Sequence, residues 1–197
     1  MRQVKSGPVV VNVSFAVKEL VENSLDAGAT SIEVRFANRG IDSITVRDDG
    51  CGISPEDHAA VARSHWTSKL KTYDDLSSLN TYGFRGEALS CICAMATLQI
   101  TTRASNCTTG SWLHFKETGE LQSSGARAYP RGTSAVVKDL LRKFPVRKNI
   151  LKANSKNDYN SALTLLRGYA CFSTGVRFTV SNTLRLVTRV HVLASVN

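Results

Sequence analysis

The chain has 197 residues, of which 42% are hydrophobic and 21% are charged, as is usual for a globular domain. It contains no apolar run near the roughly 20 residues that span a bilayer, and its amino terminus lacks the apolar core of a secretion signal. We therefore expect an intracellular protein with no membrane partner. The 25 Lys and Arg residues against 16 Asp and Glu residues give a net charge of +9, which favours polyanionic partners such as nucleic acid or nucleotides. The 5 cysteines form no CxxC pair, so neither a zinc site nor a disulfide framework is indicated.

The first predicted helix runs from about Ser14 to Leu25, with Ser14 as its N-cap and Gly28 shortly beyond its end. Alternating apolar residues then predict two strands, 31–36 and 43–48, which are separated by the turn sequence NRGID. Together they form a β-hairpin with one buried side.

The second strand of this hairpin ends in an acidic and glycine-rich turn. Asp48 continues the alternation of the strand and is expected to point towards its buried side. Gly50 and Gly52 then end the strand. The segment 55–64 starts with a proline and acidic residues and predicts a further helix.

The second half of the chain mixes strands and helices. A helix is predicted to begin near Glu87, and another covers 158–172. The predicted strands are 98–103, 111–116, 133–140, 176–182 and 184–193. This order favours an α/β sandwich with a largely antiparallel sheet and not the regular alternation of a Rossmann fold.

The first helix has two different faces. Its packing stripe consists of Val17, Leu20, Val21 and Ser24. The opposite side carries Glu19, Asn23 and Asp26. A solvated polar face would explain such a pattern, but Asn is a middling helix former that a solvated face does not require. An amide oxygen can bind Mg²⁺ and a carboxylate one turn away can activate water, so this helix is a candidate catalytic wall.

Two glycine turns could serve a nucleotide. Asp48, before Gly50 and Gly52, could accept an exocyclic amine such as that of adenine. Gly83 and Gly86 lead into the helix near Glu87, whose free N–H groups would attract phosphate. A purely structural role stays open for both turns, and the absence of a GxxxxGK[ST] sequence excludes a P-loop.

Five segments in order carry a family resemblance. They are VKELVENSLDAGA, RDDGCGI, HWTSK, YGFRGEALSCI and RGTSAVV. From about Ser6 to Asn182 the chain resembles the MutL mismatch-repair family of the gyrase, heat-shock chaperone, histidine kinase and MutL (GHKL) ATPase superfamily. The segments AYPRGTSAVVKDLLRKFPVRK and TGVRFTVSN are similar to its eukaryotic PMS-type branch. The resemblance implies a two-layer GHKL (Bergerat) sandwich, with helices on one face of a mixed, largely antiparallel sheet.

The resemblance also implies roles for individual residues. Glu19 would be the general base for water, Asn23 the Mg²⁺ ligand, and Asp48 the acceptor of the adenine amine, with Gly50 and Gly52 shaping that wall. The lid over the phosphates would consist of Thr67, Ser68, Lys69, Gly83, Phe84, Arg85, Gly86, Glu87, Ala88 and Leu89. Thr133 would support the adenine site through water, and Asp26 would have a packing or hydrogen-bonding role.

By resemblance, the chain is expected to bind and slowly hydrolyse ATP with Mg²⁺, as a dimerisation switch of a nuclear mismatch-repair protein. Its expected partners are DNA, another MutL homologue as heterodimer partner, and a mismatch-recognition complex of the MutS type. The basic segment 131–156 would contact DNA phosphates, although a merely solvated cationic surface remains an alternative. The candidate DNA-binding residues are Arg142, Lys143, Arg147 and Lys148.

Some features depart from the family. Asp49 stands where the family usually has Asn, and the added charge is expected to reduce nucleotide affinity. Residues 1–197 are expected to form a single ATPase domain, without the transducer domain, which supplies a lysine to the γ-phosphate, and without the carboxy-terminal dimerisation and endonuclease domain. The amino-terminal arm, which helps to close the ATP-bound dimer, is short. A nucleotide- and DNA-binding module without turnover is therefore the alternative function, whereas a sensor kinase is disfavoured by the GFRGEAL block.

Overall fold

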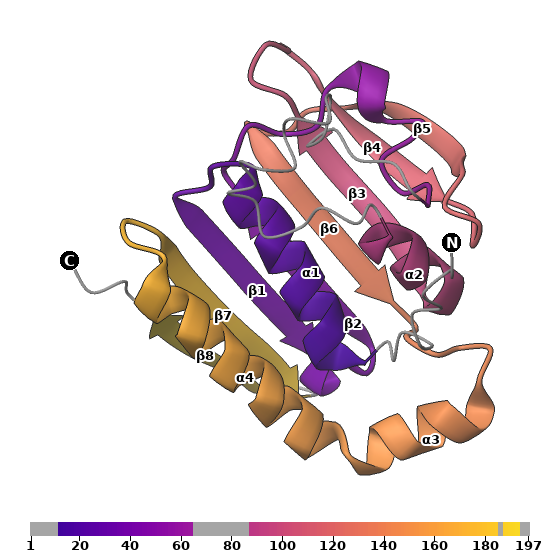
Figure 1. Ribbon diagram of the computed structural model, residues 1–197, viewed down its shortest axis with the longest axis vertical. Helices are drawn as coiled ribbons and strands as arrows, with labels where there is room; N and C mark the ends of the chain where they lie inside the picture. Colours follow the sequence, from indigo (N-terminus) through magenta and orange to yellow (C-terminus); the bar gives the residue numbers. More distant parts are fainter. Residues whose placement is uncertain (1–11, 65–86, 185–186, 194–197) are drawn as a thin grey trace, which may run out of the picture.

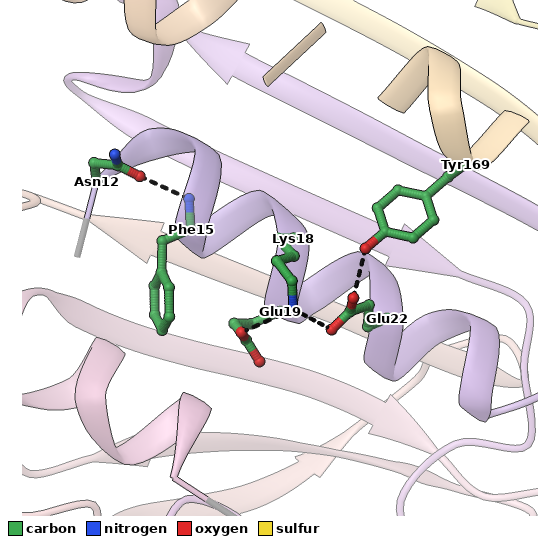
Figure 2. Close-up of polar contacts among 6 residues, drawn as sticks. All are labelled: Asn12, Phe15, Lys18, Glu19, Glu22 and Tyr169. Carbon is green, nitrogen blue, oxygen red and sulfur yellow. Dashed lines mark hydrogen bonds and ion pairs between the residues drawn. The ribbon is translucent and has the colours of Figure 1, made fainter. Parts of the chain in front are cut away.

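The computed structural model describes residues 12–64, 87–184 and 187–193, and some predicted site residues lie outside these ranges. Helix α1 (Val13–Asp26) opens the described chain and matches the predicted helix. Its N-cap is Asn12, whose side chain accepts a 2.8 Å hydrogen bond from the Phe15 amide (Figure 2). The predicted cap at Ser14 was therefore wrong, and the Ser14 hydroxyl instead bonds to the carbonyl of Asp158.

The strands form one eight-stranded sheet, with the order β5-β4-β3-β6-β2-β1-β7-β8. They are β1 (Ser31–Ala37), β2 (Ser43–Asp48), β3 (Thr97–Arg103), β4 (Gly110–Phe115), β5 (Leu121–Arg127), β6 (Gly132–Lys138), β7 (Arg177–Leu184) and β8 (Val187–Leu193). Among the described strands, only β1 and β7 pair in parallel, which confirms the mixed, largely antiparallel sheet.

The helices lie mainly on one face of this sheet. Besides α1 they are α2 (Ala88–Met95), α3 (Pro145–Ala153) and α4 (Ser155–Phe172). Helices α1, α2 and α4 lie over the same side of the strands, whereas α3 extends from one end of α4 (Figure 1). The sandwich of one helical layer and one sheet is therefore confirmed.

The core lies between α1 and the sheet. Val17 and Val21 of α1 are fully buried, as are Ile32 and Val34 of β1 and Ile44 of β2. The strand alternation that predicted the hairpin thus sets its inner face, and the pairing of Ile32 with Asp48 fixes the register. Burying such aliphatic side chains stabilises the fold by about 1.5–3 kcal/mol each.

Three local features differ from the sequence prediction. The segment after Pro55 forms only a 3₁₀ turn, η2 (Pro55–Asp57), so the predicted helix was wrong. Of its apolar residues only Ala62 is fully buried, which gives a longer helix little packing surface. Strand β5 and helix α3 were not predicted. No helix in the described part of the chain is long and apolar enough to cross a membrane.

Candidate active site

The outer face of α1 carries Glu19 and Asn23 one turn apart, and both are half-buried. The Lys18 ammonium lies 3.3 Å from Glu19 Oε1 and 2.6 Å from Glu22 Oε2 (Figure 2). Lys18 is therefore held more closely by Glu22 than by Glu19. The nearer Glu22 carboxylate neutralises part of the Lys18 charge. The ion pair between Lys18 and Glu19 is therefore weak.

Glu22 is a site residue that the sequence did not reveal. It is only 6% exposed, and its second oxygen accepts a 2.6 Å hydrogen bond from the Tyr169 hydroxyl of α4 (Figure 2). A buried carboxylate needs such partners, since an unpaired one would be strongly destabilising. Tyr169, Glu22 and Lys18 thus form a polar chain that reaches the candidate base Glu19.

Helix α2 faces the same wall. Burial raises the pKa of the Cys91 thiol, and the carboxylates of Glu87 and Glu19 raise it further. Cys91 lies in the first turn of α2, and α2 contacts α1 on the same face of the sheet (Figure 1). Glu87 is the N-cap residue of α2, and Ala88 and Leu89 follow in its first turn.

At the other end of the wall, Asp48 is 8% exposed at the end of β2, as its alternation predicted. Its Oδ2 accepts a 2.9 Å hydrogen bond from the Ser24 hydroxyl of α1. Its Oδ1 accepts hydrogen bonds from the amides of Gly50 (3.0 Å) and Thr133 (3.2 Å). Burial raises the pKa of Asp48, although these hydrogen bonds counteract the shift.

Thr133 lies in direct contact with Asp48, through its backbone amide. Its hydroxyl is also 3.1 Å from that of Thr102, which is 1% exposed. The Thr102 hydroxyl donates to the carbonyl of Gly132 and accepts from the amide of Ile53. Neither Thr102 nor Ser24 was predicted to be a site residue. In both cases the available signal was a hydroxyl residue in a row of apolar core positions.

The glycines of the turn serve protein packing in a way that the sequence did not show. A Cβ on Gly50 would lie 2.8 Å from the carbonyl oxygen of Ala27. Gly52 has a φ of +74°, and its Cβ would lie 2.2 Å from the carbonyl oxygen of Arg103. Both positions therefore require glycine to close the wall beside Asp48, whether or not a ligand also lies there.

Asp49 is directed away from its neighbour Asp48. Its carboxylate accepts hydrogen bonds from the amides of Thr30 and Ser31 (both 2.8 Å) and from the Thr30 hydroxyl (2.7 Å). Although burial acts in the opposite direction, these hydrogen bonds lower the pKa of Asp49. The extra charge is thus bound by the backbone at the beginning of β1.

The remaining lid residues lie outside the described residues. They are Thr67, Ser68, Lys69, Gly83, Phe84, Arg85 and Gly86. Their predicted contact with phosphates stays a prediction. The structure therefore brings together Glu19 and Asn23 on one helix, and joins that helix to Asp48 and Thr133 through Ser24.

The four candidate DNA-binding cations differ in their surroundings. Arg142 and Lys143 precede α3 and both pair with Glu117, at 2.7 and 2.5 Å. Arg147 and Lys148 lie in the first turn of α3, where the Arg147 guanidinium stacks over the ring of Phe144. Two of the four cations therefore share one carboxylate, which offsets one of their two charges.

Comparison with known proteins shows the family to which the chain belongs. Residues 11–143 match the family model described as "Histidine kinase-, DNA gyrase B-, and HSP90-like ATPase". The chain belongs to this ATPase family. The match covers α1, the turn after β2 and the beginning of β6, and so includes every described candidate residue of the nucleotide site.

Within this ATPase family, the chain is similar to MutL proteins. It is 45% identical over 181 residues to the DNA mismatch repair protein pms1 of Schizosaccharomyces pombe, which covers 91% of the chain but 23% of that protein. A solved N-terminal domain of a DNA repair protein matches with a TM-score of 0.80 at 33% identity, covering 92% of this chain and 52% of that one. The Aquifex aeolicus MutL ATPase domain complexed with ADP matches at 0.67 and 30%, covering 90% and 64%. The resemblance to PMS-type MutL proteins is confirmed, and the chain spans about a quarter of that pms1 relative.

Proposed function

We propose that the chain binds ATP with Mg²⁺ and hydrolyses it slowly, as the nucleotide-driven dimerisation switch of a PMS-type mismatch-repair protein. The observation that carries this proposal is the buried carboxylate of Asp48, tied to α1 through Ser24. Three donors occupy three of the about four lone-pair positions of a carboxylate. The last position suits one more donor, such as the exocyclic amine of adenine. The solved relative named as complexed with ADP supports a nucleotide at such a wall.

The residues present also fit Mg²⁺. The Asn23 amide supplies a hard oxygen on the same face as Glu19, and Mg²⁺ keeps several waters and phosphate oxygens as its other ligands. When bound, the ion neutralises charge on the phosphates. No group of three His, Cys, Asp or Glu residues that could hold a metal occurs among the described residues, so Asn23 is the protein ligand we propose.

In the proposed reaction, water attacks the γ-phosphorus, the bond to the bridging oxygen of ADP breaks, and phosphate is released. Glu19 takes the proton of the attacking water at its carboxylate. Lys18 holds this carboxylate in place, and the nearer contact of Lys18 with Glu22 keeps it from neutralising the base. Positioning and electrostatic stabilisation supply most of the rate enhancement in such phosphoryl transfers.

The experiment compares ATP binding and turnover in the wild-type chain, Glu19→Ala and Asn23→Ala. We expect Glu19→Ala to bind ATP but to lose turnover, by about 100-fold or more. Asn23→Ala should instead lose Mg²⁺-dependent binding. Unchanged turnover in Glu19→Ala would exclude this residue as the general base. If the wild-type chain binds ATP without any turnover, the alternative function of a binding module is correct.

The location of the adenine site can be tested through Cys51, which is exposed between Gly50 and Gly52. ATP should slow the alkylation of Cys51 by iodoacetamide, since a nucleotide beside Asp48 would cover this turn. Cys171, exposed on α4, serves as the internal control and should react at the same rate with or without ATP. Equal labelling of Cys51 with and without ATP would place the nucleotide elsewhere.

The partners belong to the same proposal. DNA, a second MutL homologue as heterodimer partner, a MutS-type complex and a nuclear location are supported by the similarity to mismatch-repair proteins of eukaryotes. For the DNA contact, Arg147 and Lys148 are the candidates on α3 that do not pair with Glu117 in the described structure. A steep decrease of DNA affinity with salt would support phosphate contacts there.

A further inference from the structure

A row of polar side chains crosses the end of the sheet beside the candidate nucleotide site. Strands β2, β6 and β3 are neighbours in the sheet (Figure 1) and carry Asp48, Thr133 and Thr102. Thr133 and Thr102 face each other in the strand register, and the Thr133 amide donates to Asp48. Thr102 is 1% exposed, whereas Thr133 is half-buried. Of the two threonine hydroxyls, that of Thr133 is therefore the one that a ligand beside Asp48 can reach.

The Thr102 hydroxyl uses its whole hydrogen-bonding capacity. A hydroxyl has one hydrogen to donate and two lone pairs that accept. The Thr102 oxygen accepts from the Ile53 amide at 2.9 Å, and its hydrogen is donated to the Gly132 carbonyl at 3.1 Å. Both directions are fixed, because an amide N–H can only donate and a carbonyl oxygen can only accept. One lone pair of Thr102 is left, and the Thr133 hydroxyl lies 3.1 Å away.

These contacts determine the direction of the Thr133 hydrogen. All three contacts of Thr102 form together only when Thr133 donates its hydrogen to Thr102. The reverse direction would take the Thr102 hydrogen away from the Gly132 carbonyl, and one hydrogen bond fewer makes that arrangement about tenfold less populated. The Thr133 oxygen is therefore left with two lone pairs, and no hydrogen, for a ligand.

On the proposed function, in which adenine lies beside Asp48, we infer that Thr102 is a positioning residue that selects the nucleotide base. It holds the Thr133 hydroxyl as a hydrogen-bond acceptor, and this favours 6-aminopurines over 6-oxopurines. Since three donors already occupy Asp48, its last lone pair and the Thr133 oxygen both offer acceptors to a ligand. The amine of adenine donates to such a wall. A 6-oxopurine presents a carbonyl oxygen there instead, and two acceptors form no hydrogen bond.

A water molecule between Thr133 and the base would have the same preference. A water that donates one hydrogen to Thr133 has its other hydrogen for the base, and ring nitrogen N1 of adenine accepts it. In a 6-oxopurine N1 carries a hydrogen, so it would meet the hydrogen of this water. Sites that match the donors and acceptors of one ligand reject its analogues strongly, because the mismatched polar groups lose their partners.

The test measures the affinities of ATP and of inosine triphosphate, a 6-oxopurine nucleotide, for the 197-residue chain by isothermal titration calorimetry with Mg²⁺. The readout is the ratio of the two affinities, which a general loss of stability does not change. Thr102→Val keeps the shape but cannot accept, so the Thr133 hydroxyl can turn its hydrogen towards the ligand, and the ratio should narrow about tenfold. Thr102→Ser keeps the hydroxyl and should restore the wild-type ratio.

Two further variants separate selection from packing. Ile100→Val shortens another buried side chain of β3 and should leave the ratio unchanged. Thr133→Val removes the hydroxyl through which Thr102 acts, so it should also narrow the ratio, and adding Thr102→Val to it should have no further effect. If circular dichroism shows that Thr102→Val does not fold, Thr133→Val decides the question.

A wild-type ratio in Thr133→Val, or in folded Thr102→Val, would overturn the role of Thr102. An equally narrowed ratio in Ile100→Val would overturn it too, since the effect would then come from packing alone. If the wild-type chain binds ATP without preference over inosine triphosphate, the role of Thr102 is wrong while the proposed ATP site stands. If it binds neither nucleotide, the proposed function itself is wrong, and the role of Thr102 is wrong with it.

Discussion

The Tyr169 hydroxyl donates a 2.6 Å hydrogen bond to the Glu22 carboxylate and so joins α4 to α1 across 147 residues of sequence. The other oxygen of Glu22 is held by Lys18, the neighbour of the candidate base. Through this buried carboxylate, the packing of α4 determines where the Lys18 ammonium lies relative to Glu19.

Tyr169→Phe should lower the free energy of unfolding by about 1.5–3 kcal/mol, because it leaves a buried carboxylate with one fewer donor. Urea unfolding monitored by circular dichroism measures this loss. Lys156→Ala, at an exposed position of the same helix, is the control and should change stability by about 0.5 kcal/mol or less. A Tyr169→Phe variant as stable as this control would show that the hydrogen bond contributes nothing.

The adjacent Asp48 and Asp49 should affect the pH dependence of stability with opposite signs. Burial raises the pKa of Asp48, so its contribution is present in acid and is lost as the pH rises from the ordinary Asp range through the raised pKa. The pKa of Asp49 is lowered despite its burial, by its hydrogen bonds with Thr30 and Ser31. Its contribution is therefore present above the ordinary Asp range and lost as the pH falls through the lowered pKa.

Urea unfolding between about pH 3 and pH 7 checks both signs. Relative to the wild type, Asp48→Asn should remove a component of stability that falls with increasing pH, and Asp49→Asn should remove one that rises. If both variants change the slope in the same direction, one of the two environments is described wrongly.

Glu117→Gln should strengthen duplex DNA binding and steepen its salt dependence, because Arg142 and Lys143 would lose their common carboxylate. Hydrogen bonds from these cations lower the pKa of Glu117, and the one from Lys143 has the larger effect. The carboxylate is therefore charged at neutral pH. Glu120→Gln is the matched control, since it changes the net charge equally but breaks only the pair with Lys116. Equal effects of both substitutions would show that the change in DNA affinity comes from net charge alone and not from the release of Arg142 and Lys143.

Gly52→Ala should destabilise the fold by more than about 1–3 kcal/mol, since a positive φ and a Cβ 2.2 Å from a carbonyl oxygen both oppose it. Gly168→Ala offers the opposite case. It lies within α4 with nothing within 4 Å of its Cβ, and should stabilise the chain by about 0.4–1 kcal/mol. Thermal unfolding of both variants measures the difference, and equal melting temperatures would contradict the packing described beside Asp48.

The sequence could predict features that depend on neighbours along the chain. Period-two alternation predicted the hairpin and the inward direction of Asp48, and helical spacing separated Val17 and Val21 from Glu19 and Asn23. The family resemblance then suggested why these side chains lie together.

Other features depend on residues far apart and gave no local signal. In the sequence Glu22 is typical of a solvent-facing residue, and its partner Tyr169 lies far along the chain on α4. Ser24 is typical of a small core residue, and its partner Asp48 lies at the end of β2. Strand β5, LQSSGAR, lacks apolar alternation because it is an edge strand with mostly exposed side chains. The segment of α3 was interpreted as a charged surface and not as a helix. It has little apolar pattern to reveal a helix, because Leu151 is its one buried residue.

The parallel pairing of β1 with β7 brings residue 31 beside residue 177. This contact cannot form on the ribosome before β7 has been synthesised, and the contact of α1 with α4 cannot form before α4 has been synthesised. The fold therefore has many contacts between distant residues, which slows folding because long loops must close first. During that interval the edge of β1 that later pairs with β7 is unpaired, and unpaired strand edges favour aggregation.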